Sequence, residues 1–174
     1  MNQLNENLKN YFLPICLILV LSFSRLIPHP WNFTPVLAMG IFSGFYFKQF
    51  YLGLFIVIVS MFLGDLYLGF HSTMFFTYIS LAIAVGSGVL IKHFKISEIF
   101  FSGLVCSICF FIITNFGVWL TSGMYEKNLQ GLMNSYILAI PFFHNTLIST
   151  FLFLFGIKII FDTILSNKKL LKKT

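Results

Sequence analysis

Apolar residues run along the chain in long stretches that short polar connections separate. We expect helices over 11–27, 34–47, 50–70, 73–91, 96–120 and 133–165, followed by a basic tail over 166–174. Most of these stretches approach the roughly 20 residues that a helix needs to cross a bilayer. The pattern therefore predicts an all-α polytopic membrane bundle of six transmembrane helices, with residues 1–174 forming a single domain.

The first stretch also has the polar head and the apolar centre of a signal peptide. No small-x-small cleavage site follows it before the Pro28-His29-Pro30 stop, so we interpret it as a retained helix. A cleaved signal peptide is the alternative. In the second stretch, Pro35 suits the first turn of a helix, because the N–H that it lacks would be unpaired there anyway.

Composition supports a bilayer as the solvent. Of the 174 residues, 58% are hydrophobic and only 9% are charged, whereas roughly 25% of the residues in an average soluble domain are charged. Six spanning helices would use about 120 residues. That length leaves no room for a separate soluble catalytic or nucleotide-binding domain.

Basic residues separate by predicted side. If the N-terminus is inside, Arg25 and Lys127 lie outside, and the inner side holds Lys9, Lys48, Lys92, Lys95, Lys158, Lys168, Lys169, Lys172 and Lys173. Short cytoplasmic loops carry an excess of Lys and Arg, so we expect both termini in the cytoplasm and the protein in the cytoplasmic (inner) membrane. Topology thus accounts for most of the net charge of +6. We expect contact with membrane lipid and no nucleic-acid partner.

Polar residues within or near the predicted spans gather toward the outer side. They are Arg25, Asn32, Asp65, His71, Asn115, Trp119, Tyr125, His144 and Asn145. The inner half has almost none beyond lysines and small residues. A channel or proton relay needs polar groups at several depths, so this one-sided cluster favours a pocket that captures a small-molecule solute from outside.

Asp65 is the only carboxylate that we place within the hydrocarbon, and Arg25 lies at a comparable depth on the first predicted helix. An ionised group at this depth is costly unless it is paired or functional. The two residues could form a structural ion pair that holds the first and third helices together, or either could contact a ligand.

Asn115 and Trp119 are four residues apart and therefore share one face of the fifth predicted helix. An amide and an indole on one face can hold a polar, partly aromatic ligand. Two other interpretations stay open. Trp119 could belong to the interfacial aromatic belt, and Asn115 could form a hydrogen bond between helices.

Pro141 falls inside the sixth predicted helix, close to His144 and Asn145. A proline within a helix removes a backbone hydrogen bond, so we expect freed carbonyls beside an imidazole and an amide, which would form a local polar site. The alternative is a kink whose freed groups are satisfied by Asn145 and neighbouring helices.

Metal chemistry is not indicated. His29, His71, His144 and Asp65 have no helical i, i+3 or i+4 spacing among them, so we expect no metal site. The three cysteines, Cys16, Cys106 and Cys109, are interpreted as small core residues without a disulfide.

Enzyme signatures such as H-E-x-x-H, G-x-S-x-G and Walker A are absent from the sequence. We therefore expect neither enzymatic activity nor a cofactor. An intramembrane enzyme that uses His144 or His71 as a base is a less favoured alternative.

Small residues recur at four-residue spacing in the second and fourth predicted helices, a pattern that lets helices approach closely. The pairs are Gly40 with Gly44, Ala82 with Gly86, and Ala84 with Gly88. They could serve packing within the bundle or docking of another membrane subunit.

Four strings carry a resemblance to a known group of proteins. They are RLIPHPWNFTPV (25–36), GDLYLGFH (64–71), TNFGVW (114–119) and AIPFFHNTL (139–147). They look like an uncharacterised family of small bacterial membrane proteins, which in turn resembles the substrate-binding S components of energy-coupling factor (ECF) transporters. The resemblance implies a six-helix subunit that captures a vitamin-like micronutrient at its outer face and works with a transmembrane T subunit and two ATPase subunits.

Two features depart from S components. Many of them carry an A-x-x-x-A-like docking motif in the first helix, which 11–27 lacks; Gly40-x-x-x-Gly44 could substitute, or the protein could work alone. Nickel and cobalt relatives begin with Met-x-His, whereas this chain begins Met1-Asn2-Gln3, which disfavours a metal-ion permease. A structural or assembly protein, whose outer polar cluster only locks the helices together, is the alternative to solute binding.

Overall fold

The computed structural model describes residues 12, 15–16, 19–20 and 23–171, with side chains described as far as 164. Of the helix expected over 11–27, residues 11, 13–14, 17–18 and 21–22 lie outside the described residues, as do Lys9 and, from the basic tail expected over 166–174, residues 172–174. Residues 166–171 continue the last helix, and the side chains of Lys168 and Lys169 are not described. Near the end of the first expected helix lies η1, a 3-10 turn over Ser24–Leu26.

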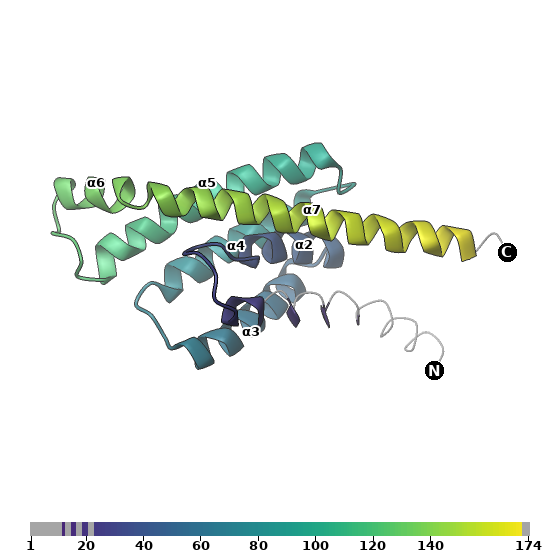
Figure 1. Ribbon diagram of the computed structural model, residues 1–174, viewed down its shortest axis with the longest axis horizontal. Helices are drawn as coiled ribbons and strands as arrows, with labels where there is room; N and C mark the ends of the chain where they lie inside the picture. The colour runs from purple at the N-terminus through teal and green to yellow at the C-terminus, as the bar shows by residue number, and fades with distance from the viewer. Residues whose placement is uncertain (1–11, 13–14, 17–18, 21–22, 172–174) are drawn as a thin grey trace.

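The described chain is all-α, as predicted. Six α-helices follow η1, and they are α2 (Val36–Phe47), α3 (Phe50–Leu68), α4 (Met74–Leu90), α5 (Ile96–Thr121), α6 (Leu129–Ile137) and α7 (Ile140–Leu171) (Figure 1). The helices α2 to α5 match the ranges expected from the apolar stretches to within a few residues. Short polar connections end each of them, which is why the hydropathy pattern places them well.

Three helices are long and apolar enough to cross a membrane, namely α3, α5 and α7 over residues 140–164. The apolar helices α2 and α4 are shorter, at 12 and 17 residues. Large apolar side chains lie on the outside of the bundle; Phe55 is 65% exposed and Phe75 68% exposed. Such surfaces suit lipid rather than water, so these helices indicate a membrane protein.

The single helix expected over 133–165 is two helices. The α6 helix begins earlier, where the side chain of Asn128 accepts a hydrogen bond from the Gly131 amide, and the helical path breaks at 138–139. Pro141 then lies in the first turn of α7, where its missing N–H removes no helical hydrogen bond. The expectation that Pro141 interrupts the interior of a helix is wrong.

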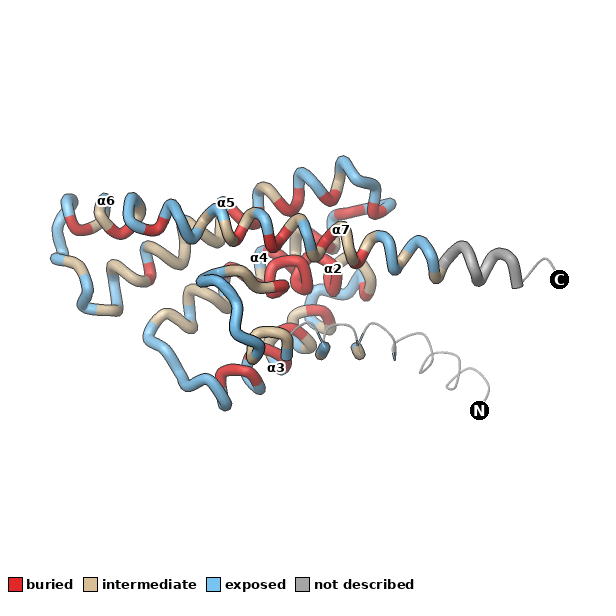
Figure 2. The backbone as a smooth tube through the Cα atoms, in the orientation of Figure 1, coloured by how far each residue is buried: buried red, intermediate tan, exposed pale blue. Residues whose placement is uncertain are grey.

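Buried residues gather along α2, which lies at the centre of the bundle (Figure 2). It crosses α4 at very short range, because a Cβ atom on Gly44 would lie 2.0 Å from the Val85 carbonyl oxygen and one on Gly88 would lie 2.0 Å from that of Ile41. A Cβ on Gly40 would lie 2.9 Å from that of Ala84. The glycines of α2 therefore serve packing inside the bundle.

This burial corrects one expectation, since Gly40-x-x-x-Gly44 presents no free surface to a partner subunit. Ala82 and Gly86 differ from that pair. Both are partly exposed, and a Cβ on Gly86 would meet only the ring of Phe50, at an ordinary 3.7 Å.

Lys48 joins the ends of α2 and α4. Its Nζ donates hydrogen bonds to the carbonyls of Val89 and Ile91 and lies 4.8 Å from the centre of the Phe45 ring. The α2–α3 and α4–α5 connections therefore lie at one end of the bundle. The α3–α4 and α5–α6 connections lie at the other end, where the candidate site is found (Figure 1).

Candidate functional site

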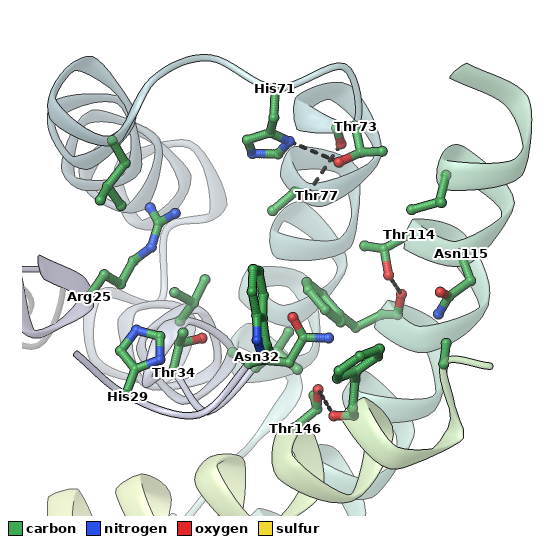
Figure 3. Close-up of a pocket in the computed structure, with 18 of the residues that line it drawn as sticks. Arg25, His29, Asn32, Thr34, His71, Thr73, Thr77, Thr114, Asn115 and Thr146 are labelled. Atoms are coloured by element: carbon green, nitrogen blue, oxygen red, sulfur yellow. Dashed lines mark hydrogen bonds between the residues drawn. The ribbon is translucent and has the colours of Figure 1, made fainter. Parts of the chain in front are cut away.

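A cavity of about 840 Å³ opens at the end of the bundle that carries the α3–α4 and α5–α6 connections. Residues from 25–37 and from all six α-helices or their connections line it (Figure 3). Its polar lining residues are Arg25, His29, Asn32, Thr34, His71, Thr73, Thr77, Thr114, Asn115, Tyr125, Ser135, Thr146 and Thr150.

One wall of the cavity is the irregular segment between η1 and α2. The side-chain amide of Asn145 on α7 donates a hydrogen bond to the Trp31 carbonyl, at 2.9 Å. The Phe33 amide closes a turn onto the Pro30 carbonyl, and Asn32 has a left-handed backbone with φ 60°. Asn tolerates that conformation better than most residues. Local turns and contacts from α7, which also include the Phe153 ring at 6.3 Å from that of Phe33, thus shape this wall.

Arg25 stands beside this wall and pairs with Asp65 of α3. Its Nη2 lies 3.1 Å from Asp65 Oδ1, and its Nη1 lies 3.1 Å from the sulfur of Met61. The phenol of Tyr78 on α4 donates to Asp65 Oδ2 at 2.8 Å. The ion pair predicted as one alternative is therefore present, and it connects η1, α3 and α4.

The two partners of this ion pair differ in access to the cavity. The side chain of Asp65 is 1% exposed and is not part of the lining, whereas that of Arg25 is 14% exposed and lines the cavity. Gly64 makes room for the guanidinium, since a Cβ there would lie 3.3 Å from Arg25 Nη1. The cavity therefore meets the cation and not the carboxylate.

Threonines supply much of the remaining polar lining. The hydroxyls of Thr77, Thr114 and Thr146 each donate to the backbone carbonyl four residues earlier, at 3.3, 2.7 and 3.1 Å. The Asn115 amide donates to the Phe111 carbonyl at 2.8 Å. With these protons used in the helices, the side-chain oxygens keep lone pairs that can accept hydrogen bonds from a ligand.

Apolar and aromatic side chains complete the lining, among them Trp31, Met61, Phe110, Met124 and Phe142. Pockets for small molecules measure roughly 300–1,000 Å³ and combine apolar walls with a few placed polar groups. The cavity has that size and that mixture. It can therefore enclose a molecule with both a polar and an apolar part.

Five of the nine residues predicted for binding line this cavity, namely Arg25, Asn32, His71, Asn115 and Tyr125. Asp65 is not part of the lining, because it is buried and contacts Arg25. His71 forms a contact with the Thr73 hydroxyl at 2.8 Å, and Thr73 is the residue that directly precedes α4. The cavity thus brings together residues as far apart in the sequence as Arg25 and Thr150.

Trp119 lies apart from the cavity lining. Its indole N–H donates to the Glu126 carbonyl at 2.9 Å, and the Lys127 Nζ lies 5.5 Å from its ring centre. The indole therefore fixes the α5–α6 connection. Although Trp119 and Asn115 were expected to act on one face, only the amide lines the cavity.

His144 and Asn145 are also not part of the lining. The exposed ring of His144 lies with Nδ1 3.0 Å from the Ile140 carbonyl of its own helix. Asn145 touches the backbone of the cavity wall rather than the cavity itself. Its place is that of a residue that positions the wall.

The threonines were missed because a threonine inside an apolar helix satisfies its own hydroxyl and so does not stand out in the sequence. A signal was present. Thr73 and Thr77 are four residues apart, as are Thr146 and Thr150, and each pair therefore shares a helix face. Two such faces on otherwise apolar helices indicate a polar wall.

Metal-ligand side chains do not converge within the part of the chain that the structure describes, where no three His, Cys, Asp or Glu residues come together. Cys16, Cys106 and Cys109 are free thiols, and Cys106 is buried.

Comparison with known proteins gives one finding. Neither curated proteins nor solved structures provide a match. The sequence profile of a family of unknown function, DUF6580, matches residues 5–170, which is nearly the whole chain. The chain belongs to the DUF6580 family.

Proposed function

We propose that the protein is a membrane solute-binding subunit, similar to an ECF transporter S component, that captures a vitamin-like micronutrient from the outer face. The observation that carries this proposal is the cavity of about 840 Å³, which is open at one end of the bundle and lined by polar groups from every described α-helix or its connections.

Orientation follows from the basic residues. Lys48 ends α2, and Lys92 and Lys95 lie in the α4–α5 connection, at the end opposite the cavity. Since such residues favour the cytoplasmic side, the cavity faces outward in a six-span protein with both termini in the cytoplasm. A solute would then enter from outside the cell.

Uphill transport by such a subunit needs an energy source on another chain, and the S-component resemblance supplies candidates in a T subunit and two ATPases. Because Gly40 and Gly44 are buried against α4, a partner would dock elsewhere on the bundle. Capture of the solute requires only the cavity, so it can be tested on the protein alone.

The test begins with gentle purification in detergent and native mass spectrometry for a co-purifying small molecule. Thr114→Trp places a large side chain in the cavity, and Leu120→Trp provides the control at an exposed position of the same helix that is not part of the lining. We expect the bound molecule, or the thermal shift from an added vitamin panel, to disappear in Thr114→Trp only. An empty protein that no compound stabilises would refute solute binding.

One observation favours the alternative of a structural or assembly protein. Within the described residues, no buried side-chain nitrogen or oxygen lacks a hydrogen-bond partner, so the polar groups are satisfied without a ligand. If the protein is a structural or assembly protein, Asn115→Ala should unfold the bundle, because the Asn115 side chain would then help to hold the helices together. Under solute binding the same change leaves the fold nearly intact and weakens ligand retention.

A further inference from the structure

Among the described residues that line the cavity, Arg25 is the one that carries a full charge. It lines the cavity together with His29 and His71, and no Asp or Glu is found among the described lining residues. In a site partly screened from water, such a wall attracts negative charge more strongly than it would in bulk solvent. The lining alone therefore indicates the sign of the ligand.

Arg25 keeps capacity for a ligand despite its ion pair. A guanidinium has five N–H donors, and its hydrogen bonds with the described residues engage Nη1 with Met61 and Nη2 with Asp65. Asp65 is held from its other side by Tyr78. Asp65 therefore anchors the cation while its own charge stays buried. Figure 3 shows Arg25 at the edge of the cavity.

The side of the cavity that lies opposite Arg25 offers hydrogen-bond acceptors. Figure 3 shows Thr114 and Asn115 across the cavity from Arg25. Both donate to backbone carbonyls of α5, and so does Thr146 within α7. Their oxygens thus offer acceptors, which match N–H or O–H groups on a ligand.

We propose that the solute is a small organic anion whose carboxylate or phosphate group binds the Arg25 guanidinium and whose N–H or O–H groups meet the acceptors of α5 and α7. This inference rests on the proposed function, because it names the class of molecule that the same cavity takes. Arginine suits both anions, since its planar fork can donate two parallel hydrogen bonds.

The experiment uses the full-length purified protein and a small-molecule extract of bacterial cells, separated by anion exchange into a retained, anionic fraction and an unretained fraction. We expect only the anionic fraction to raise the melting temperature. Treatment with a phosphatase distinguishes the two anions, because it abolishes the shift if the group is a phosphate ester and leaves it if the group is a carboxylate.

Two variants connect the result to Arg25. The double change Arg25→Leu and Asp65→Leu removes the ion pair without leaving a buried charge unpaired, and it should abolish the shift. Arg25→Lys keeps the charge but loses the fork, and it should weaken binding about tenfold, as expected for one charge-assisted hydrogen bond. The control is the other ion pair of the described chain, removed as Lys158→Leu and Asp162→Leu, which should respond like the wild type.

The outcomes separate this inference from the proposed function. A shift from the unretained fraction alone, or an anionic shift that survives loss of Arg25 in a folded double variant, would overturn the anion assignment while solute binding stands. No shift from either fraction, with an empty purified protein, would overturn solute binding and the anion assignment together.

Discussion

The side chain of Asn145 on α7 holds the backbone carbonyl of Trp31, 114 residues earlier in the chain, at 2.9 Å. This hydrogen bond ties the segment between η1 and α2 to α7. Because that segment forms one wall of the cavity, Asn145 acts on any solute through the position of the wall rather than by direct contact.

Replacing Asn145 with Ala should therefore free the wall without unfolding the helices. We expect faster hydrogen exchange of the amides of residues 31–34, and solute binding weakened several-fold, since a single neutral hydrogen bond contributes about 0.5–1.5 kcal/mol. Asn134→Ala is the control, because its side chain bonds within α6 to Gln130. Unchanged exchange in Asn145→Ala would show that the wall does not depend on this contact.

The Arg25–Asp65 ion pair leads to a prediction about the free energy of unfolding. Asp65→Leu alone should lower the free energy of unfolding by about 3 kcal/mol, because the guanidinium is left in a partly buried place without its partner. Adding Arg25→Leu should restore most of that loss. Unfolding in mixed detergent measures both, and equal losses in the single and double variants would contradict the pairing.

Close packing of α2 on α4 gives a third prediction. Gly44→Ala should cost about 2 kcal/mol or more, because a Cβ would lie 2.0 Å from a backbone oxygen and force the helices apart. Gly156→Ala on α7 is the matched control. It meets nothing within 4 Å, and removing a helical glycine there should stabilise the protein by about 0.5–1 kcal/mol. Thermal unfolding of the two variants should move in opposite directions.

Asn115 and Trp119 share a helix but not, in the structure, the cavity. Asn115→Leu should weaken solute binding about tenfold by removing a hydrogen-bond acceptor. Trp119→Phe should change affinity less than about twofold and should instead loosen the α5–α6 connection. Titration of the recovered solute by calorimetry compares them, and the reverse order of effects would restore Trp119 as a ligand residue.

The helices α2 to α5 could be predicted from the sequence because polar residues such as Lys48 and the run 92–95 interrupt the apolar stretches sharply. The break at 138–139 could not, since Leu138 and Ala139 are as apolar as their neighbours. Backbone geometry at that point depends on packing that hydropathy does not record. Pro141 marks the irregularity, but it lies in the first turn of the helix that follows the break instead of interrupting a helix interior.

Some candidate-site residues could likewise be predicted from the sequence, and others could not. Charged or amide side chains at the outer end, such as Arg25 and Asn115, stood out because lipid makes them costly. Spacing alone did not distinguish Asn115 from Trp119, because residues four apart share a helix face. On that face of α5, Asn115 lines the cavity, whereas Trp119 contacts the α5–α6 connection. Self-satisfied threonines such as Thr114 carried no such cost, so they became visible only in three dimensions.

The contacts of Lys48 with the end of α4 affect how experiments on membrane orientation should be designed. Its ammonium group stabilises the end of α4 through the Val89 and Ile91 carbonyls, and its backbone lies in the left-handed region with φ 54°. Charge reversal at this position would disrupt a helix terminus as well as an insertion signal. Reporter-fusion studies should therefore reverse Lys92 and Lys95, which are exposed, so that an inverted protein can be distinguished from a damaged one.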